Sequence, residues 1–226
     1  MKQVKAVIFD MDGLLVDSEP IQFETSKLLF RRHGHRFTVR HLRKFLGIRL
    51  IDELTTLKHH WKLSQGVNEL QNERKDIFLK LVRQKLHLSR GASELLEFLR
   101  KVGLPIGLGT SADSWFVDEV MEKFNIRHYF DAIVDAGGVK KGKPNPEVYL
   151  KVAERLKVSP KNCLVLEDAI NGVAAAKNAD MMCFAIPNPY IPKKHYQGAD
   201  QIFQSLQEVT RSLIEIRNNR KKYNSR

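Results

Sequence analysis

The chain has 226 residues, of which 42% are hydrophobic and 28% are charged, and its formal net charge is +12. This length suits one globular domain with an insertion, and the composition is ordinary for such a protein. Apolar stretches stay well below the roughly 20 residues that a membrane helix needs, and the run Ala6–Phe9 is too short for a secretory signal. We therefore expect a cytoplasmic protein that does not enter a membrane, and its basic charge favours anionic ligands.

Five short apolar runs are predicted as β-strands, because each has strand length and is bounded by turn residues or aspartate. Between them lie segments in which apolar residues recur with helical spacing, for example 95–102, 116–124 and 148–156. Strands that alternate with helices in this way predict an α/β fold, a Rossmann-like parallel sheet with helices on both faces. The predicted strands are 4–10, 105–110, 132–136, 163–168 and 182–186.

One segment, residues 18–87, departs from this alternation because it contains helical patterns and no convincing strand. Pro20 suits the first turn of a helix, where its missing N–H would be unpaired anyway. We interpret the segment as an inserted, all-helical cap domain, and residues 1–17 with 88–216 as the Rossmann-like core. The predicted helices of the cap are 20–33, 39–46, 50–62 and 67–86.

The C-terminal end of the chain is strongly basic. From Arg211 onward there are six Lys and Arg residues against one acidic residue, Glu215. Few apolar side chains follow Ile216, so residues 217–226 are predicted to form a flexible basic tail. A solvated tail is favoured over a nucleic-acid-binding arm, and nucleic acid is not an expected partner.

Acidic side chains follow two of the predicted strands. Asp10 and Asp12 lie in the sequence Asp-Met-Asp-Gly at the end of the first strand, and Glu167 and Asp168 end the fourth. Parallel strands bring their carboxyl ends to one edge of the sheet, where open α/β sheets bind ligands. Carboxylates gathered there would repel one another without a cation, and their hard oxygen atoms suit Mg²⁺. Each motif alone has a simpler interpretation, since Asp-Gly is a common turn and Glu167-Asp168 could cap a helix.

Two further features suit a bound phosphate. Thr110 and Ser111 end the second strand, where hydroxyls and backbone N–H groups at a helix start can hold phosphate oxygens. Lys143 lies in Gly-Lys-Pro-Asn-Pro after the third strand and can act as a point charge on phosphate. The alternatives are an ordinary Ser/Thr helix cap and a solvated surface lysine.

These elements arrive in order, each after a strand of one parallel sheet, in the stretches VIFDMDGLLVDSEP, LGTSA, KGKPNPEVY and LVLEDAINGVAAAKNADM. In this combination the chain resembles the haloacid dehalogenase-like hydrolase superfamily, in the branch that contains β-phosphoglucomutase and the small sugar-phosphate phosphatases. The resemblance covers nearly the whole chain apart from the tail. Two places depart from the family pattern: Asp180 stands where glycine is usual, and Gly137-Gly138 is less typical.

The resemblance implies a phosphatase that acts on a small phosphorylated metabolite through an aspartyl-phosphate. Asp10 would be the nucleophile and Asp12 the general acid and base, while Thr110 and Lys143 would hold the transferring phosphoryl group. The helical insertion would close over the substrate. Its loop Gly47-Ile48-Arg49 would set substrate specificity.

The same resemblance implies a Mg²⁺ site. The ion would be bound by Asp10, by the backbone carbonyl of Asp12 and by Asp168. Glu167 would bind the ion directly or through water.

Two other functions stay open. A phosphomutase needs a place for a second phosphate, but a mutase-like Ser-Lys-Asn is replaced here by Ala112-Asp113-Ser114, and a mutase-like histidine by Gln22. The mutase-like cap arginine falls at Leu50, although neighbouring Arg49 could substitute.

A non-catalytic binding protein with a degenerate site is disfavoured, because the nucleophile, the acid/base and the metal ligands are all present. We expect a phosphatase that is a monomer.

Overall fold

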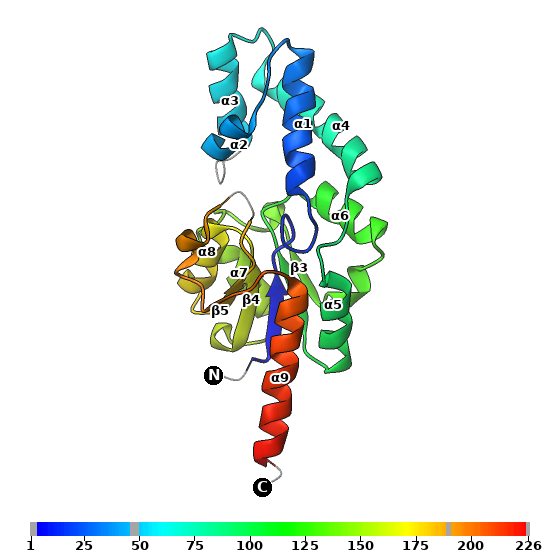
Figure 1. Cartoon of the computed structure of the whole chain (residues 1–226), viewed down its shortest axis with the longest axis vertical. Coiled ribbons are helices and arrows are strands. Elements are labelled where there is room, and N and C mark those ends of the chain that lie inside the picture. The colour runs from blue at the N-terminus through cyan, green and yellow to red at the C-terminus, as the bar shows by residue number, and fades with distance from the viewer. Residues whose placement is uncertain (1–3, 46–49, 189–190, 225–226) are drawn as a thin grey trace. The chain divides into compact units, whose positions relative to one another are not determined.

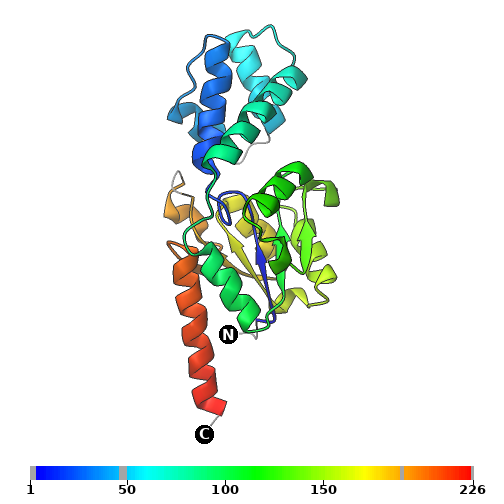
Figure 2. The ribbon, with the colours of Figure 1, turned by 90° about the vertical axis from the view of Figure 1, so that its right-hand side faces the viewer.

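The computed structural model describes residues 4–45, 50–188 and 191–224. The chain divides into two compact units. One, the α/β unit, contains the chain up to Val16 and again from Leu88 onward, and the other, the helical unit, is Asp17–His87. Figures 1 and 2 show the ribbon of each unit from two directions.

The α/β unit is built on a sheet of six parallel strands in the order β3-β2-β1-β4-β5-β6. Its central strands are buried along their whole length, as expected for a parallel sheet that is covered on both faces. The predicted α/β fold with a Rossmann-like parallel sheet is confirmed. The strands are β1 (Ala6–Phe9), β2 (Ile106–Gly109), β3 (Ala132–Val134), β4 (Cys163–Glu167), β5 (Met182–Ala185) and β6 (Gln201–Ile202).

The sheet has one strand more than the sequence predicts. The residues of β6, Gln201 and Ile202, pair with Phe184 and Ala185 at the edge of the sheet. Both are exposed, so this strand has neither the length nor the apolar run by which the other strands are recognised. The prediction of five strands is therefore wrong by one edge strand.

Helices cover both faces of the sheet. On one face α7 and α8 share a buried cluster with β1, β3, β4 and β5, and on the opposite face α5 packs against β2 and α9. Leu95, Leu96 and Leu99 of α5 are fully buried, which accounts for the helical apolar spacing there. The helices are α5 (Ala92–Lys101), α6 (Ser114–Lys123), α7 (Glu147–Arg155), α8 (Ile170–Asn178) and α9 (Leu206–Asn224), with 3₁₀ turns at Arg127–Tyr129, Ala136–Gly138, Pro160–Asn162 and Lys193–Tyr196.

The strand order reverses at β1, which has β2 on one side and β4 on the other. Phe9 pairs with Leu166 in register, so β1 and β4 end side by side. Ligands of open α/β sheets bind at such a switch point, outside the carboxyl ends of the strands. The residues that follow Phe9 and Leu166 are therefore placed to form a site.

The helical unit has an aromatic core. The rings of Phe30 and Phe37 stack with centroids 5.6 Å apart, Phe30 lies 4.7 Å from Trp61, and His35 stacks on Trp61 at 5.0 Å. Its helices begin and end within one residue of the predicted ranges. They are α1 (Glu19–Arg32), α2 (Val39–Phe45), α3 (Leu50–Trp61) and α4 (Val67–Lys85).

The helix α9 runs from Leu206 to Asn224. It therefore extends past residue 216, where the basic sequence predicts the start of a flexible tail. Leu206 and Val209 are buried, while residues 217–219 are exposed. Arg and Lys are good helix formers, which explains why the backbone continues as helix past its buried turns. Among the described residues, no helix has both the length and the apolar character that crossing a membrane requires.

Candidate active site

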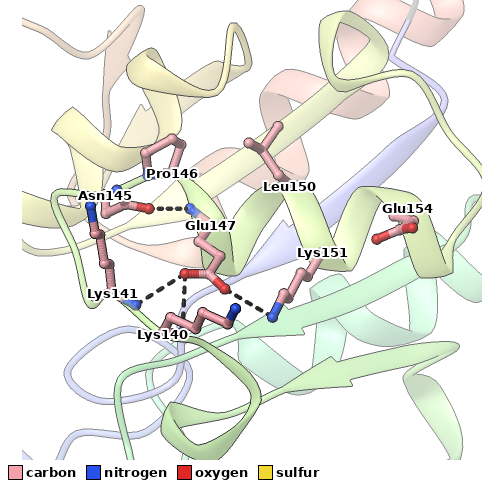
Figure 3. A pocket seen from close by; sticks show the side chains of 8 residues that line it. All are labelled: Lys140, Lys141, Asn145, Pro146, Glu147, Leu150, Lys151 and Glu154. Atoms are coloured by element: carbon pink, nitrogen blue, oxygen red, sulfur yellow. Dashed lines mark hydrogen bonds and ion pairs between the residues drawn. The ribbon is translucent and has the colours of Figure 1, made fainter.

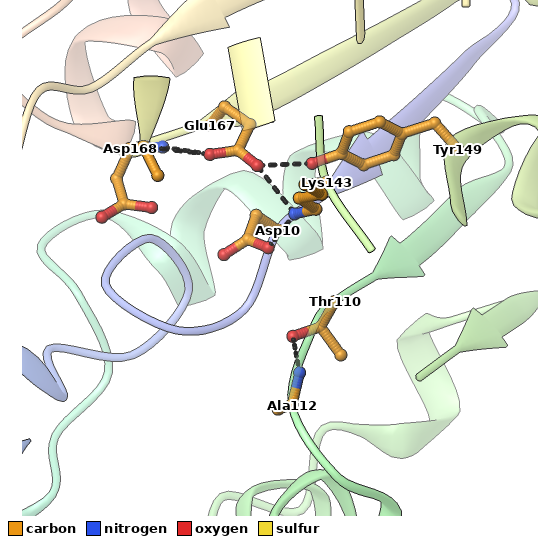
Figure 4. A network of polar contacts seen from close by, with 8 residues as sticks. Asp10, Thr110, Ala112, Lys143, Tyr149, Glu167 and Asp168 are labelled. Atoms are coloured by element: carbon orange, nitrogen blue, oxygen red, sulfur yellow. Dashed lines mark hydrogen bonds and ion pairs between the residues drawn. The ribbon is translucent and has the colours of Figure 1, made fainter. Parts of the chain in front are cut away.

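Three carboxylates meet at the carboxyl ends of β1 and β4. Asp10 follows β1, Glu167 is the last residue of β4, and Asp168 comes next, and all three are buried. One carboxylate oxygen from each lies within 4.8 Å of the others, an arrangement that could hold a metal ion. The sequence places these residues at one edge of the sheet, and Figure 4 shows their side chains facing one another there.

Lys143 reaches the same cluster from the loop that precedes α7. Its Nζ lies 2.5 Å from Oδ1 of Asp10 and 2.7 Å from Oε1 of Glu167, and its side chain is only 8% exposed. Burial by itself would lower the pKa of Lys143, but the carboxylates of Asp10 and Glu167 outweigh it and raise the pKa above its usual value. Lys143 is therefore a fixed positive charge at the site and not a solvated surface lysine.

The charge balance around Asp10 remains negative. The pKa of Asp10 is raised to about 7, chiefly by burial, with Lys143 opposing the rise and Glu167 adding to it. A divalent cation beside Asp10 would lower this pKa again and hold the carboxylate ionised. Hard carboxylate oxygens are the ligands that Mg²⁺ prefers. The donor set therefore fits the Mg²⁺ that the sequence predicts.

Two glycines bring backbone against these carboxylates. Gly13 has a φ of +87°, and a Cβ there would lie 2.3 Å from Oδ2 of Asp168. A Cβ on Gly172, in the first turn of α8, would lie 1.6 Å from Oε1 of Glu167. A larger residue at either position would displace a carboxylate, so both glycines are required by close approach of the backbone.

Asp12 lies in the turn between β1 and α1 and pairs with Val16 through an isolated bridge. Its charge adds to the raised pKa of Asp10. Within the described chain, its carboxylate is not one of the three that could share a metal ion. A metal contact through the backbone carbonyl of Asp12 stays a prediction.

Thr110 and Ser111 follow β2, the neighbour of β1 in the sheet. Thr110 is buried, and its Oγ1 accepts a hydrogen bond of 3.1 Å from the backbone N–H of Ala112, so its own O–H can still donate. Ser111 is exposed. The strand end thus presents the buried hydroxyl of Thr110, seen in Figure 4, and the exposed hydroxyl of Ser111.

Glu147 fixes the loop that carries Lys143. Its Oε2 accepts hydrogen bonds of 3.0 Å from the backbone N–H groups of Lys140 and Lys141, and its Oε1 pairs with Lys151 at 2.9 Å. The residues that make these contacts line a surface hollow (Figure 3). None of the predicted site residues lines it, so neither Lys143 nor any residue of the acidic cluster belongs to this hollow.

Tyr149 belongs to the site, although the sequence motifs give it no role. Helical spacing places it on an apolar face, yet its hydroxyl donates a hydrogen bond of 2.6 Å to Oε1 of Glu167. The available signal is a lone tyrosine among aliphatic residues, because a buried tyrosine hydroxyl needs a partner. The predicted specificity residues Gly47, Ile48 and Arg49 lie outside the described residues.

The departure at Asp180 has a visible consequence. Its φ is 60°, in the left-handed region that glycine adopts readily and other residues rarely. Asp180 is exposed and lies in the turn between α8 and β5, away from the acidic cluster. The turn therefore keeps a glycine-like conformation without glycine.

A family model described as haloacid dehalogenase-like hydrolase matches residues 7–186, a range that includes the whole acidic cluster and Lys143. The chain belongs to this family. The resemblance drawn from the four sequence motifs is thereby confirmed.

Relatives of this haloacid dehalogenase-like hydrolase include named phosphatases. The "Phosphorylated carbohydrates phosphatase" of Thermotoga maritima is 34% identical over 180 residues, which are 78% of this chain and 82% of the relative. "Hexitol phosphatase B" of Escherichia coli K12 is 32% identical over 213 residues, 92% of this chain and 96% of the relative. A solved structure of a candidate β-phosphoglucomutase from Thermotoga maritima has a TM-score of 0.83 and 30% identity, and covers 94% of this chain and 100% of its own.

Proposed function

We propose that this hydrolase is a Mg²⁺-dependent phosphatase that releases phosphate from a small phosphorylated metabolite, in particular a sugar phosphate. The observation that carries the proposal is the buried cluster of Asp10, Glu167 and Asp168, with Lys143 paired to two of its members. Such a cluster sets an aspartate nucleophile beside a metal site and a fixed positive charge. The substrate class is supported by the relatives named for phosphorylated carbohydrates and for hexitol.

Asp10 acts as the nucleophile and Asp12 as the acid and base. An oxygen of the Asp10 carboxylate attacks phosphorus, the bond between phosphorus and the substrate oxygen breaks, and Asp12 protonates the departing alcohol. Water then attacks the aspartyl-phosphate and gives a proton to Asp12. Inorganic phosphate leaves and the carboxylate of Asp10 is restored. Acid–base assistance of this kind contributes ~10²–10⁴-fold in rate.

The residues that would hold Mg²⁺ are Asp10, Asp168 and Asp12 through its backbone carbonyl, with Glu167 bound directly or through water. When bound, the ion supplies positive charge that offsets the repulsion between a carboxylate nucleophile and an anionic phosphate. Gly13 allows the turn after Asp12 to approach Asp168 closely enough to close this site. The folded protein positions the ligands of the ion, because the strand ends already bring the carboxylates together.

Lys143, Thr110 and Ser111 would bind the phosphoryl oxygens. Lys143 supplies a charge that its neighbours hold in place, and Thr110 has a hydroxyl hydrogen still available to donate. Positioning and charge neutralisation account for most of the catalysis of phosphoryl transfer, so few other groups are needed.

A phosphomutase is the second candidate, because a solved structure of similar fold is described as a candidate β-phosphoglucomutase. The exposed carboxylate of Asp113, at the N-cap of α6, disfavours it because a second phosphate near Asp113 would be repelled. A non-catalytic binding protein is disfavoured by the convergence of Asp10, Asp168 and Lys143. We also propose that the protein is a monomer, that it is cytoplasmic, and that Gly47-Ile48-Arg49 sets its substrate specificity.

A phosphate-release screen tests the proposed function. Purified protein with Mg²⁺ is given p-nitrophenyl phosphate and a panel of hexose, hexitol and glycerol phosphates, and inorganic phosphate is measured. Protein with Asp10→Asn, purified in the same way, controls for contaminating phosphatases. We expect release from at least one sugar or sugar-alcohol phosphate. Release no greater than that of the Asp10→Asn protein with every compound would overturn the proposal.

A further inference from the structure

A chain of hydrogen bonds runs from Tyr149 through Glu167 to Lys143 and ends on Asp10 (Figure 4). The hydroxyl of Tyr149 donates to Oε1 of Glu167 at 2.6 Å, and Nζ of Lys143 donates to the same oxygen at 2.7 Å. Nζ also donates to Oδ1 of Asp10 at 2.5 Å. Tyr149 and Glu167 are completely buried, so the chain connects the interior of the α/β unit to the proposed nucleophile.

The carboxylate of Glu167 has all of its acceptor positions occupied. Oε1 accepts from Tyr149 and Lys143, and Oε2 accepts from the backbone N–H groups of Asp168 and Ala169, both at 2.9 Å. An ionised carboxylate offers about four lone-pair positions, which these hydrogen bonds fill. A metal ion bound directly by Glu167 would have to displace one of these donors.

The backbone of α8 also confines the carboxylate of Glu167 on one side. A Cβ on Gly172 would lie 1.6 Å from its Oε1, so the backbone of α8 lies directly against the carboxylate. Asp10 and Asp168 keep 6% and 3% of their surface exposed, whereas Glu167 keeps 0%. Since Mg²⁺ usually retains several waters, the partly accessible pair suits the ion better than the enclosed Glu167.

We infer that Glu167 is the anchor of Lys143 and not a direct metal ligand, and that Tyr149 is a positioning residue that acts through this anchor. The ammonium group of Lys143 donates one hydrogen bond to Glu167 and one to Asp10. Its third N–H can donate to a phosphoryl oxygen. The ring of Tyr149, 4.7 Å from Nζ, adds a cation–π contact on another side. The inference rests on the proposed function, in which Lys143 holds the phosphoryl group.

Tyr149→Phe isolates the hydroxyl, because the ring and its contact with Lys143 are kept. Val209→Ala, at a buried position of α9 that contributes no side chain to the proposed site, is the control for lost stability. Calorimetry on wild type and both variants measures the binding of Mg²⁺ alone and of inorganic phosphate in the presence of Mg²⁺. Steady-state kinetics with p-nitrophenyl phosphate give kcat and KM.

We expect Tyr149→Phe to weaken phosphate binding and to lower kcat/KM by about tenfold, the size of one hydrogen bond to a charged group. Mg²⁺ affinity should stay within about twofold of wild type, because the metal ligands are untouched. Val209→Ala should change none of these quantities by more than about twofold. Gly172→Ala, whose Cβ would collide with Oε1 of Glu167, should give the pattern of Tyr149→Phe. It is the replacement variant if the Tyr149→Phe protein does not fold.

A loss of Mg²⁺ affinity of about tenfold or more with phosphate binding intact would make Glu167 part of the metal site and overturn the inference. Values for Tyr149→Phe equal to those of Val209→Ala would overturn it as well, because Tyr149 would then only pack. If wild type binds Mg²⁺ and phosphate but shows no turnover, the proposed function fails alone. The two binding measurements then still decide the role of Tyr149.

Discussion

Lys143 and Asp10 form a buried ion pair with Nζ and Oδ1 2.5 Å apart, although 133 residues separate them in the chain. The pair connects the first strand to a loop in the second half of the sequence, so it exists only in the folded α/β unit. Each side chain is 8% exposed. Removing one member of such a pair leaves the other charge buried without its partner, which is destabilising. The effect of a substitution at either residue therefore depends on whether the remaining charge keeps a partner.

Asp10→Asn should abolish phosphate release and leave the fold intact. The amide has nearly the size of the carboxylate, and its oxygen can still accept from Lys143, but it cannot attack phosphorus. We expect a loss of kcat of roughly a thousandfold or more for p-nitrophenyl phosphate. Circular dichroism should be unchanged. Turnover within about tenfold of wild type would exclude Asp10 as the nucleophile.

Phosphate release should require Mg²⁺ and be inhibited by Ca²⁺. Both ions bind oxygen ligands, but Ca²⁺ accepts more of them in looser geometry and could engage both oxygens of Asp10. Dialysis against EDTA should remove activity, added Mg²⁺ should restore it, and increasing Ca²⁺ at fixed Mg²⁺ should lower the rate. Full turnover in excess EDTA would contradict a metal site at Asp10 and Asp168.

The edge of the sheet that carries the site can be predicted from sequence because its strands end in distinctive residues. Asp10 and Glu167 each follow an apolar run, and the pairing of Phe9 with Leu166 brings them together as the parallel-sheet rule requires. The pattern does not show that Glu167 and Asp168, although adjacent, have different surroundings. That difference depends on hydrogen bonds from residues distant in the chain, such as Tyr149.

Tyr149 and β6 are missed for opposite reasons. Tyr149 lies on an apolar helical face, and hydrophobic periodicity reports burial without reporting what a hydroxyl contacts. The strand β6 has two exposed residues, Gln201 and Ile202, so its place in the sheet comes from pairing with β5 and not from its own side chains. Both features are set by tertiary contacts that a single sequence does not display.

Truncation after Ile216 should leave catalysis unchanged. The buried residues of α9, Leu206 and Val209, lie before this point, and residues 217–219 are exposed. We expect kcat/KM for p-nitrophenyl phosphate within about twofold of the full chain, because the removed residues are distant from the packed part of the helix. Size-exclusion chromatography of both proteins is the control. A large loss of activity would show that the end of α9 supports the site or another subunit.

Asp180→Gly should stabilise the α/β unit. At a φ of 60° an aspartate carries backbone strain that glycine avoids, although glycine also gains freedom in the unfolded chain. We expect the free energy of unfolding to rise by about 0.5–1 kcal/mol in urea titrations. Glu97→Gly, at an exposed position within α5, should instead lower it by about 1 kcal/mol. A loss of stability in Asp180→Gly would show that the aspartate side chain supports the turn.

Release of phosphate should exceed isomerisation of β-glucose 1-phosphate. A mutase keeps its aspartyl-phosphate from water until a second sugar position is phosphorylated, and for this it must bind the phosphate that is not reacting. Asp113 stands where a mutase-like lysine would hold that phosphate, and its Oδ2 accepts a hydrogen bond of 3.1 Å from the indole N–H of Trp115. This hydrogen bond ties the Asp113 side chain to the first turn of α6.

Two anions about 4 Å apart repel by roughly 1 kcal/mol in water and about 4 kcal/mol at an effective dielectric constant near 20. Bisphosphate binding should therefore be weaker by about one to three powers of ten than with a lysine there. A coupled glucose-6-phosphate dehydrogenase assay, primed with the bisphosphate and run beside a phosphate-release assay, should detect release and no isomerisation. Asp113→Asn, which removes the charge alone, should bind the bisphosphate more tightly. Isomerisation faster than release would make the protein a mutase, with Asp10, Asp12 and the Mg²⁺ site in the same roles.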